Sequence, residues 1–300
     1  MQIFLGIAGI AVVIFGLLDI FHTLLHPSGT GRLTRFVLAG IWRASRAMRH
    51  KAGSMVGPAA MVLVVLSWVG LQILGWALVY WPHIPAGFAY SPGIDPSKYH
   101  DLAEALYLST VTLSTLGFGD VVPSDPFIRA LTPLEALTGF GLLTAALTWF
   151  TQIYAPLSRR RALALKLRGL AVAGFADRMQ VADVPTAALV LDAIAAEVAK
   201  VDVDFIQYTE GFYFREEDPD LSLAKQLGYA VQVRDVVLSS NEPCLRLAGE
   251  QLSAALDHLA ATLGGKFLTT RGSTEDIFAA YAAEHGQNPA PGNNDNDPGL

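Results

Sequence analysis

A short glycine-containing string, TLGFGD at residues 115–120, carries residue types whose backbone could coordinate a cation. Along an extended strand successive residues alternate between two sides, so their carbonyl groups cannot all face one ion. Glycines at alternate positions, here Gly117 and Gly119, permit left-handed dihedrals that turn successive carbonyls toward one axis. Such carbonyl oxygens can replace the hydration shell of a cation. The Thr115 hydroxyl can add an oxygen at the inner end, and Asp120 a charge at the outer mouth.

The segments on both sides of this string are apolar enough to cross a bilayer. Of the 300 residues, 52% are hydrophobic and only 16% are charged, which is too apolar a balance for an ordinary soluble protein. Three segments approach the ~20 apolar residues that a bilayer core requires, namely residues 3–18 with a possible extension to 25, 59–81 and 130–155. We expect the first to be a retained helix, because the basic segment and the cleavage site of a signal peptide are missing.

The distribution of basic residues predicts the orientation in the membrane. Arginines are frequent between the first two spans and form a triplet at 159–161, whereas residues 82–128 contain only Lys98. Basic segments stay on the cytosolic side. We therefore expect a multi-pass protein of the plasma membrane whose N-terminus faces out and whose chain after residue 155 is cytosolic.

A short helix is predicted at residues 101–114, directly before the glycine string. Irregular backbone at membrane depth is tolerated only where it is buried in protein or lines water. A long helix, a short re-entrant helix, a glycine-rich return and a second long helix are therefore expected to surround an aqueous path.

With its threonine-rich preceding helix, the string at 115–120 resembles the selectivity filter of the potassium channel superfamily. The resemblance implies passive K⁺ permeation, with no cofactor besides the permeant ion. It also implies a homotetramer, because one filter strand cannot surround an ion. The implied K⁺ ligands are the carbonyls of Thr115, Leu116, Gly117 and Phe118, and the side chains of Leu116 and Phe118 are expected behind the loop.

The resemblance also assigns roles to the last span. Gly139 or Gly141 stands where family members carry a gating hinge, although close helix packing explains either glycine equally well. Leu143, Leu147 and Thr151 follow at helical spacing and are expected on the cavity face.

Several residues depart from the family pattern or carry charge inside a span. Tyr107 stands in a short helix without the paired tryptophans of some members, and Val111 occupies a position where some have a glutamate that bonds the filter aspartate. A less rigid filter is expected for this reason. Glu135 could brace the re-entrant helix by accepting hydrogen bonds; nearby hydroxyls or Arg129 could satisfy it instead.

Asp19, His22 and His26 lie at i, i+3 and i+7, on one helix face. This spacing could hold a metal ion. We favour a polar cluster that ties the first helix to the basic loop after it. Gln72 in the second span is expected to form an interhelical hydrogen bond.

The basic loop itself contains Arg43, Arg46 and Arg49 at every third position, as in voltage sensors. The apolar run before these arginines is too short to span a bilayer. An amphipathic helix with its arginines at anionic lipid headgroups fits better. The apolar residues expected to dip into the membrane are Phe36, Val37 and Ile41.

The cytosolic part is helical in its periodicity, with helix starts predicted at Pro185, Asp218-Pro219, Pro243 and Ser273. The glycine-rich strand–turn–helix fingerprint is not recognisable there, so we do not expect the nucleotide-binding regulatory fold of many prokaryotic potassium channels. The cytosolic regulator is unknown. The acidic residues 216–220 could attract a divalent ion, but we favour a solvated loop. Cys244 is expected to be a small buried hydrophobe. The net charge of -6 gives no reason to expect nucleic-acid binding.

The sequence thus predicts an all-α membrane protein with three transmembrane helices, a re-entrant pore helix and filter loop, and a helical cytosolic domain. The expected domains are an N-terminal transmembrane helix (1–27), a basic cytosolic loop (28–57), a pore domain (58–156), a helical cytosolic domain (157–286) and a disordered tail (287–300). The favoured function is a non-enzymatic, potassium-selective channel. A less selective monovalent cation channel and a membrane-bound metal enzyme are the alternatives.

Overall fold

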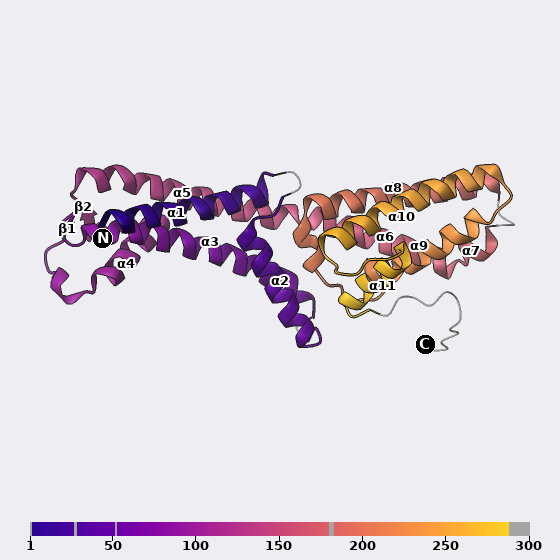
Figure 1. The fold of residues 1–300 in the computed structure, drawn as a ribbon, viewed down its shortest axis with the longest axis horizontal. Coiled ribbons are helices and arrows are strands. Elements are labelled where there is room, and N and C mark those ends of the chain that lie inside the picture. The colour runs from indigo at the N-terminus through magenta and orange to yellow at the C-terminus, as the bar shows by residue number, and fades with distance from the viewer. Residues whose placement is uncertain (1, 27–28, 52, 180–182, 288–300) are drawn as a thin grey trace. The chain divides into compact units, whose positions relative to one another are not determined.

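The structure, a computed structural model, describes residues 2–26, 29–51, 53–179 and 183–287 (Figure 1). The chain forms two compact units. The first contains Met1–Leu38 and Ala60–Thr151, and the second contains Ala39–Ala59 and Gln152–Leu300. Helices dominate both units, and the strands among the described residues are β1 (Phe88–Tyr90) and β2 (Val121–Pro123). The prediction of an all-α membrane protein is confirmed.

Three long apolar helices form the first unit. They are α1 (Gln2–Leu24), α3 (Val56–Tyr80) and α5 (Pro126–Gln152). Each belongs to a stretch long and apolar enough to cross a membrane, and the third stretch continues through α6 to Val172. The three predicted spans therefore correspond to helices, with boundaries shifted by a few residues.

Glycine permits α1 and α3 to approach closely. A side chain at Gly9 of α1 would collide with the Gly75 carbonyl oxygen of α3, only 2.5 Å from the Cβ position. Nearby, the Gln72 amide donates a hydrogen bond of 3.2 Å to the Val13 carbonyl. The predicted interhelical bond of Gln72 is confirmed.

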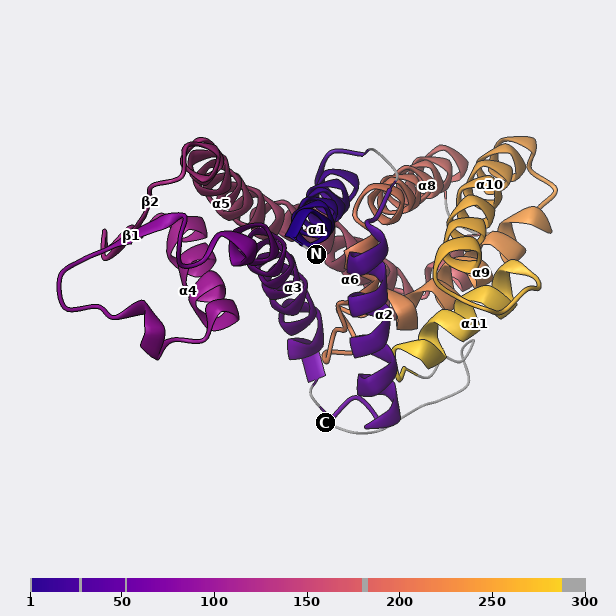
Figure 2. The ribbon, with the colours of Figure 1, turned by 60° about the vertical axis from the view of Figure 1, so that its left-hand side comes forward.

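A short helix and a two-stranded sheet lie at one end of the first unit (Figure 2). Helix α4 (Asp101–Leu113) occupies the predicted re-entrant segment. The chain then passes through the TLGFGD string into β2, which pairs antiparallel with β1 so that Tyr90 lies opposite Val121. The sheet thereby ties the chain that leaves the string to the segment that precedes α4.

Helix α2 (Arg32–Ala47) has residues in both units, because the boundary falls after Leu38. Phe36 is 71% exposed, whereas Ile41 packs against the core of the second unit and Trp42 is buried in it. The Trp42 indole also donates to the Glu284 carboxylate at 3.2 Å. The prediction that Ile41 dips into the membrane is therefore wrong, because protein side chains cover this part of the apolar face.

The second unit is a bundle of helices beyond the last predicted span. Helix α8 packs along α10, and α6 lies against both α8 and α9. The bounds of its helices are α6 Tyr154–Val172, α7 Phe175–Arg178, α8 Val184–Gln207, α9 Leu223–Leu238, α10 Pro243–Lys266 and α11 Thr274–Glu284. The predicted helix start at Asp218-Pro219 is displaced to Leu223, since the Asp218 side chain caps a turn by accepting from the Asp220 N–H at 2.9 Å.

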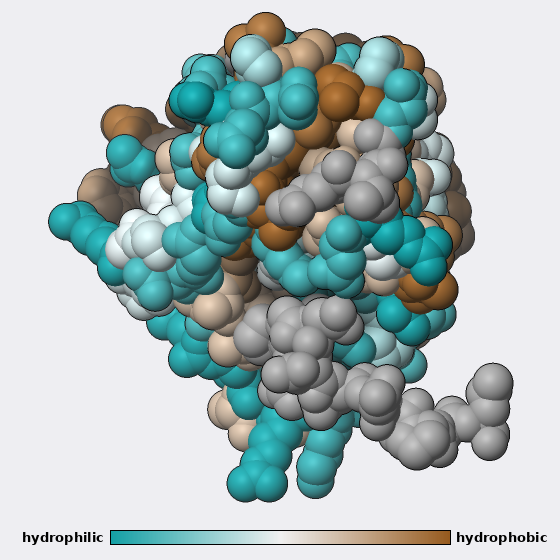
Figure 3. All heavy atoms as spheres, turned by 90° about the vertical axis from the view of Figure 1, so that its right-hand side faces the viewer, coloured by the Kyte–Doolittle hydropathy of each residue, from teal (hydrophilic) through white to brown (hydrophobic). Residues whose placement is uncertain are grey.

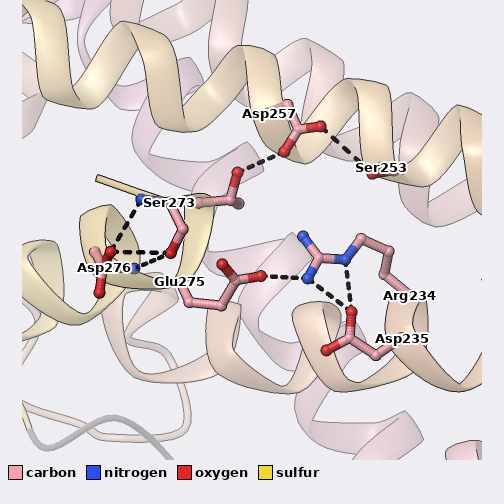
Figure 4. Close-up of polar contacts among 8 residues, drawn as sticks. Arg234, Asp235, Ser253, Asp257, Ser273, Glu275 and Asp276 are labelled. Atoms are coloured by element: carbon pink, nitrogen blue, oxygen red, sulfur yellow. Dashed lines mark hydrogen bonds and ion pairs between the residues drawn. The ribbon is translucent and has the colours of Figure 1, made fainter. Parts of the chain in front are cut away.

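Polar contacts fix α11 against its neighbours (Figure 4). The predicted capping box is present, because the side chains of Ser273 and Asp276 each accept a bond from the other's backbone N–H. An ion pair between Arg234 and Glu275 joins α9 to α11. This pair lowers the pKa of Glu275 to about 2, chiefly through the hydrogen bond from Arg234.

One prediction about a side chain in the second unit is wrong, and another holds only in part. Cys244 is exposed, because the buried face of α10 is formed by Leu245 and the residues in helical register with it. The acidic segment is a loop with residues 217–219 exposed, as predicted, but two of its carboxylates are paired: Glu216 pairs with Arg161 at 2.8 Å, and Asp220 pairs with an arginine of α6 at 2.9 Å.

Hydrophilic side chains cover much of the face of the second unit shown in Figure 3, around a hydrophobic patch. The predicted disordered tail, residues 287–300, lies outside the described residues apart from Gln287.

Candidate functional site

The pore-loop string begins where α4 ends. Helix α4 closes at Leu113, and Ser114 caps it by donating its N–H to the Thr110 carbonyl at 3.0 Å. The C-terminal end of a helix carries partial negative charge. The string therefore starts at a helix end that favours a nearby cation.

The backbone of the string alternates in handedness. Thr115, Gly117 and Gly119 have φ angles of 58°, 51° and 75°, all in the left-handed region, whereas Leu116 and Phe118 do not. This alternation is what brings successive carbonyls to one side of a chain. The left-handed glycines were predicted; the left-handed threonine was not, and a β-branched residue there is strained. Strain of this kind is characteristic of functional sites.

The string is open to its surroundings in a single chain. Leu116 is 57% and Phe118 65% exposed, although both side chains are large and apolar. A cavity of about 710 Å³ borders the string. Its lining combines threonines, apolar side chains and one arginine: Val111, Thr112, Thr115, Gly117, Val122, Pro123, Arg129, Thr132, Pro133 and Ala136.

Hydrogen bonds from two elements hold the outer end of the string. The Tyr107 hydroxyl of α4 donates to the Asp120 carboxylate at 2.5 Å. The Ser91 N–H donates to the Asp120 carbonyl at 2.8 Å, and its hydroxyl donates to the Gly119 carbonyl at 3.2 Å. A tyrosine phenol is protonated at neutral pH and so remains a donor in this bond. Tyr107 thus forms the side-chain hydrogen bond to Asp120 that the apolar side chain of Val111 cannot form.

Glu135 joins three helices behind the string. Its side chain is fully buried, and each carboxylate oxygen accepts a hydroxyl bond of 2.5 Å, one from Tyr80 of α3 and one from Ser109 of α4. The carboxylate therefore ties the re-entrant helix to both long helices that flank it. The sequence pointed to Glu135 through its charge within a span, but nothing in the local pattern identified Tyr80 as its partner.

Gly139 and Gly141, the two hinge candidates, differ in their surroundings. A Cβ at Gly139 would lie 1.9 Å from the Leu113 carbonyl oxygen, so α5 passes the end of α4 with no room for a side chain. This contact favours the packing interpretation of Gly139. A Cβ at Gly141 would meet open space. Leu143 and Leu147 are each 58% exposed, and Thr151 is exposed too.

Asp19 caps α2 from within the first unit. It is 4% exposed and accepts bonds from the Leu33 N–H at 2.8 Å, the Thr34 hydroxyl at 2.8 Å and the Trp68 indole at 2.9 Å. His22 instead bonds the carbonyl of the residue four before it and stacks on His26. The predicted cluster is confirmed only for Asp19, which ties the first helix to the basic loop, whereas His22 bonds back to its own helix.

Comparison with known proteins agrees with this geometry. A family model described as "Ion channel" matches residues 68–155, which include the second half of α3, all of α4, the string and α5. The pore region of this chain therefore resembles the potassium channel superfamily, because residues 68–155 match an ion-channel family and two of its relatives are named as potassium channels.

Three curated relatives are similar to parts of the chain. An uncharacterized membrane protein YdjJ of Bacillus subtilis (strain 168) is 27% identical over 55% of this chain and 48% of its own length. A cyclic nucleotide-gated potassium channel of Rhizobium etli is 29% identical over 37% and 31%. Two pore potassium channel c of Oryza sativa subsp. japonica is 33% identical over 26% and 16%.

This chain therefore spans about half or less of the length of these relatives. No solved structure matches it.

Proposed function

We propose that this chain is one subunit of a homotetrameric, potassium-selective channel. The observation that carries the proposal is the alternating left-handed backbone at Thr115, Gly117 and Gly119. In a four-fold assembly this backbone would present rings of carbonyl oxygens from residues 115–118 to dehydrated K⁺. Asp120 would place negative charge at the outer mouth.

Four copies are needed because one string contributes one oxygen to each ring. The exposure of Leu116 and Phe118 in a single chain supports this assembly, since large apolar side chains beside a pore require cover. Transport would be passive, through a plasma membrane crossed with the N-terminus outside and the second unit in the cytosol. The protein would have no enzymatic activity and need no cofactor besides the permeant ion.

The arginines of α2 are suited to the anionic headgroups of the cytosolic leaflet. Arg32, Arg35 and Arg43 are all exposed. Arg46 is instead paired with Glu284 of the second unit. We assign the lipid contact to the unpaired part of the helix.

The filter is tested by K⁺ flux into liposomes that contain the purified full-length protein. At Gly117 a Cβ meets no atom within 4 Å, so Gly117→Ala strains the left-handed backbone without a clash. We expect this variant to lose selective K⁺ flux. Gly6→Ala in α1 is the matched control, because that position is equally open and has no positive φ. Equal selective flux in both variants would contradict the proposal.

A further inference from the structure

The carbonyl groups of the pore-loop string fall into two sets. Those of residues 115–118 accept no hydrogen bond from any residue that the structure describes. The next two carbonyls do accept one: that of Gly119 accepts from the Ser91 hydroxyl at 3.2 Å, and that of Asp120 accepts from the Ser91 N–H at 2.8 Å. A bonded carbonyl oxygen points toward its donor. The boundary between unbonded and bonded carbonyls therefore falls between Phe118 and Gly119.

Ser91 is positioned by the strand that precedes it. Tyr90, the last residue of β1, lies opposite Val121, the first residue of β2, so Ser91 meets the string where the string enters the sheet. At the other end of β2, the Ser124 N–H donates to the Gly87 carbonyl at 2.9 Å. The chain that returns from the string is thus held on both sides of β2, and Ser91 provides the contact nearest to the string.

Gly119 connects the last unbonded carbonyl to the first bonded one. Its φ of 75° is left-handed, and glycine adopts either sign of φ at little cost. A Cβ at this position would meet no atom within 4 Å, so neighbouring atoms do not confine the backbone there. The peptide that follows Gly119 is restrained by hydrogen bonds instead, and the Ser91 hydroxyl supplies the bond to its carbonyl.

Tyr107 acts on the same end of the string through a different group. Its hydroxyl binds the carboxylate of Asp120 and not a backbone carbonyl. The Ser91 hydroxyl binds the backbone carbonyl of Gly119. The two hydroxyls therefore have separable effects: Tyr107 holds the charged side chain at the outer end, and Ser91 orients the peptide beside the unbonded carbonyls.

We propose that Ser91 is a positioning residue that ends the run of ion-facing carbonyls at Phe118. Its hydroxyl holds the Gly119 carbonyl toward the segment that contains β1, so the outermost ligand of the ion path is the carbonyl of Phe118. Without the hydroxyl, the peptide after Gly119 can rotate, and the left-handed backbone that orients the Phe118 carbonyl loses a restraint. This inference rests on the proposed potassium-selective channel and adds to it the residue that sets the outer boundary of its ion sites.

The test is the dissociation constant for K⁺, measured by isothermal titration calorimetry with KCl on the full-length protein purified in NaCl and detergent. We expect Ser91→Ala to weaken K⁺ binding about fivefold, the effect of losing one hydrogen bond from a hydroxyl. Ser91→Thr keeps a hydroxyl and should bind K⁺ like the wild type. Ser97→Ala is the matched control, because the Ser97 hydroxyl belongs to the same loop before α4 but donates to the Asp95 carboxylate at 2.7 Å.

A merely structural role for Ser91 predicts a different result. It would lower the melting temperature in NaCl or the fraction of protein that binds K⁺, and it would leave the dissociation constant unchanged. An unchanged dissociation constant in Ser91→Ala would therefore overturn the proposal. Equal weakening in Ser91→Ala and Ser91→Thr would overturn it too, because the hydroxyl would then not be the group responsible.

Reversal potentials of the same proteins in planar bilayers separate this inference from the proposed channel. With K⁺ on one side and Na⁺ on the other, we expect the value for Ser91→Ala to shift toward zero relative to Ser97→Ala. A selective wild type with equal values in these two variants would refute only the role of Ser91. A wild type that neither binds K⁺ in preference to Na⁺ nor shows a selective reversal potential would refute the channel itself, and the role of Ser91 with it.

Discussion

Glu135 shows what a single residue contributes to the pore region. A carboxylate buried in a membrane unit is costly unless donors satisfy it. Tyr80 and Ser109 supply one donor to each of its oxygens, at 2.5 Å. Since the three residues belong to α3, α4 and α5, the carboxylate positions the helix that precedes the filter string.

Glu135→Ala is therefore expected to destabilise the pore region. The substitution leaves two buried hydroxyls without their acceptor and opens a cavity, for a cost of about 2–5 kcal/mol. The measurement is the apparent melting temperature of the detergent-solubilised protein. Glu250→Ala, at an exposed position of α10, is the control and should melt like the wild type. If Glu135→Ala melted at the same temperature as this control, the bracing role would be refuted.

At the residue scale, the sequence was enough to identify individual functional residues but not the residues that form hydrogen bonds with them. Gly117, Gly119 and Glu135 were recognisable because glycine at alternate positions and charge within a span have few physical explanations. Tyr80 and Ser91 were not recognisable, because their bonds join segments 55 and 28 residues apart. The periodicity of a helix or strand does not predict a contact between such distant segments.

At the scale of elements, α2 shows that the periodicity of apolar residues predicts a helix but not what its apolar face contacts. Its amphipathic pattern correctly predicts a helix with an apolar face, but the pattern does not distinguish lipid from protein as the cover of that face. Trp42 and Ile41 pack on the second unit. At the N-terminal end of α2, the Asp19 carboxylate accepts bonds from N–H groups of the first turn of that helix. Such groups have no acceptor within the helix itself.

Helix α11 ends in a buried histidine that gives the second unit a dependence on pH. His285 caps the helix, and its ring nitrogens lie 2.9 Å from the Phe212 carbonyl oxygen and 3.0 Å from that of Tyr281. Burial, aided by the charge of Arg160, lowers the pKa of His285 to about 3, although the bonds to the two carbonyls act in the opposite direction. The folded state therefore keeps this imidazole neutral.

The sign of the effect follows from the ordinary histidine pKa of about 6.5 in the unfolded chain. Below that pH the unfolded state binds a proton that the folded state does not, so stability falls until the folded pKa is reached. Between pH 7.5 and 5.0 the expected loss is about 2 kcal/mol. We expect His285→Gln to reduce this loss, measured as the difference in melting temperature between the two pH values. His258→Gln, at an exposed position of α10, should leave the difference unchanged; the same unchanged difference in His285→Gln would contradict the assignment.

At the scale of the whole molecule, the two units differ in how much their sequence predicts. The pore region was predictable in outline, because membrane spans, a re-entrant helix and a glycine string each require residue types and lengths that can be recognised in a single sequence. The second unit was predictable only as a set of helices, since pairings such as α8 with α10 depend on contacts far apart in sequence. The predicted basic loop, 28–57, is also divided between the units, with residues 39–59 belonging to the second.

The most direct test of the channel is the reversal potential of the purified protein in a planar bilayer, with K⁺ on one side and Na⁺ on the other. A tetrameric filter built from residues 115–118 predicts a value near the potassium equilibrium potential. The same value should be obtained with Gly6→Ala and lost with Gly117→Ala. A reversal potential near zero in the wild-type protein would contradict potassium selectivity and leave a monovalent cation channel of the same architecture.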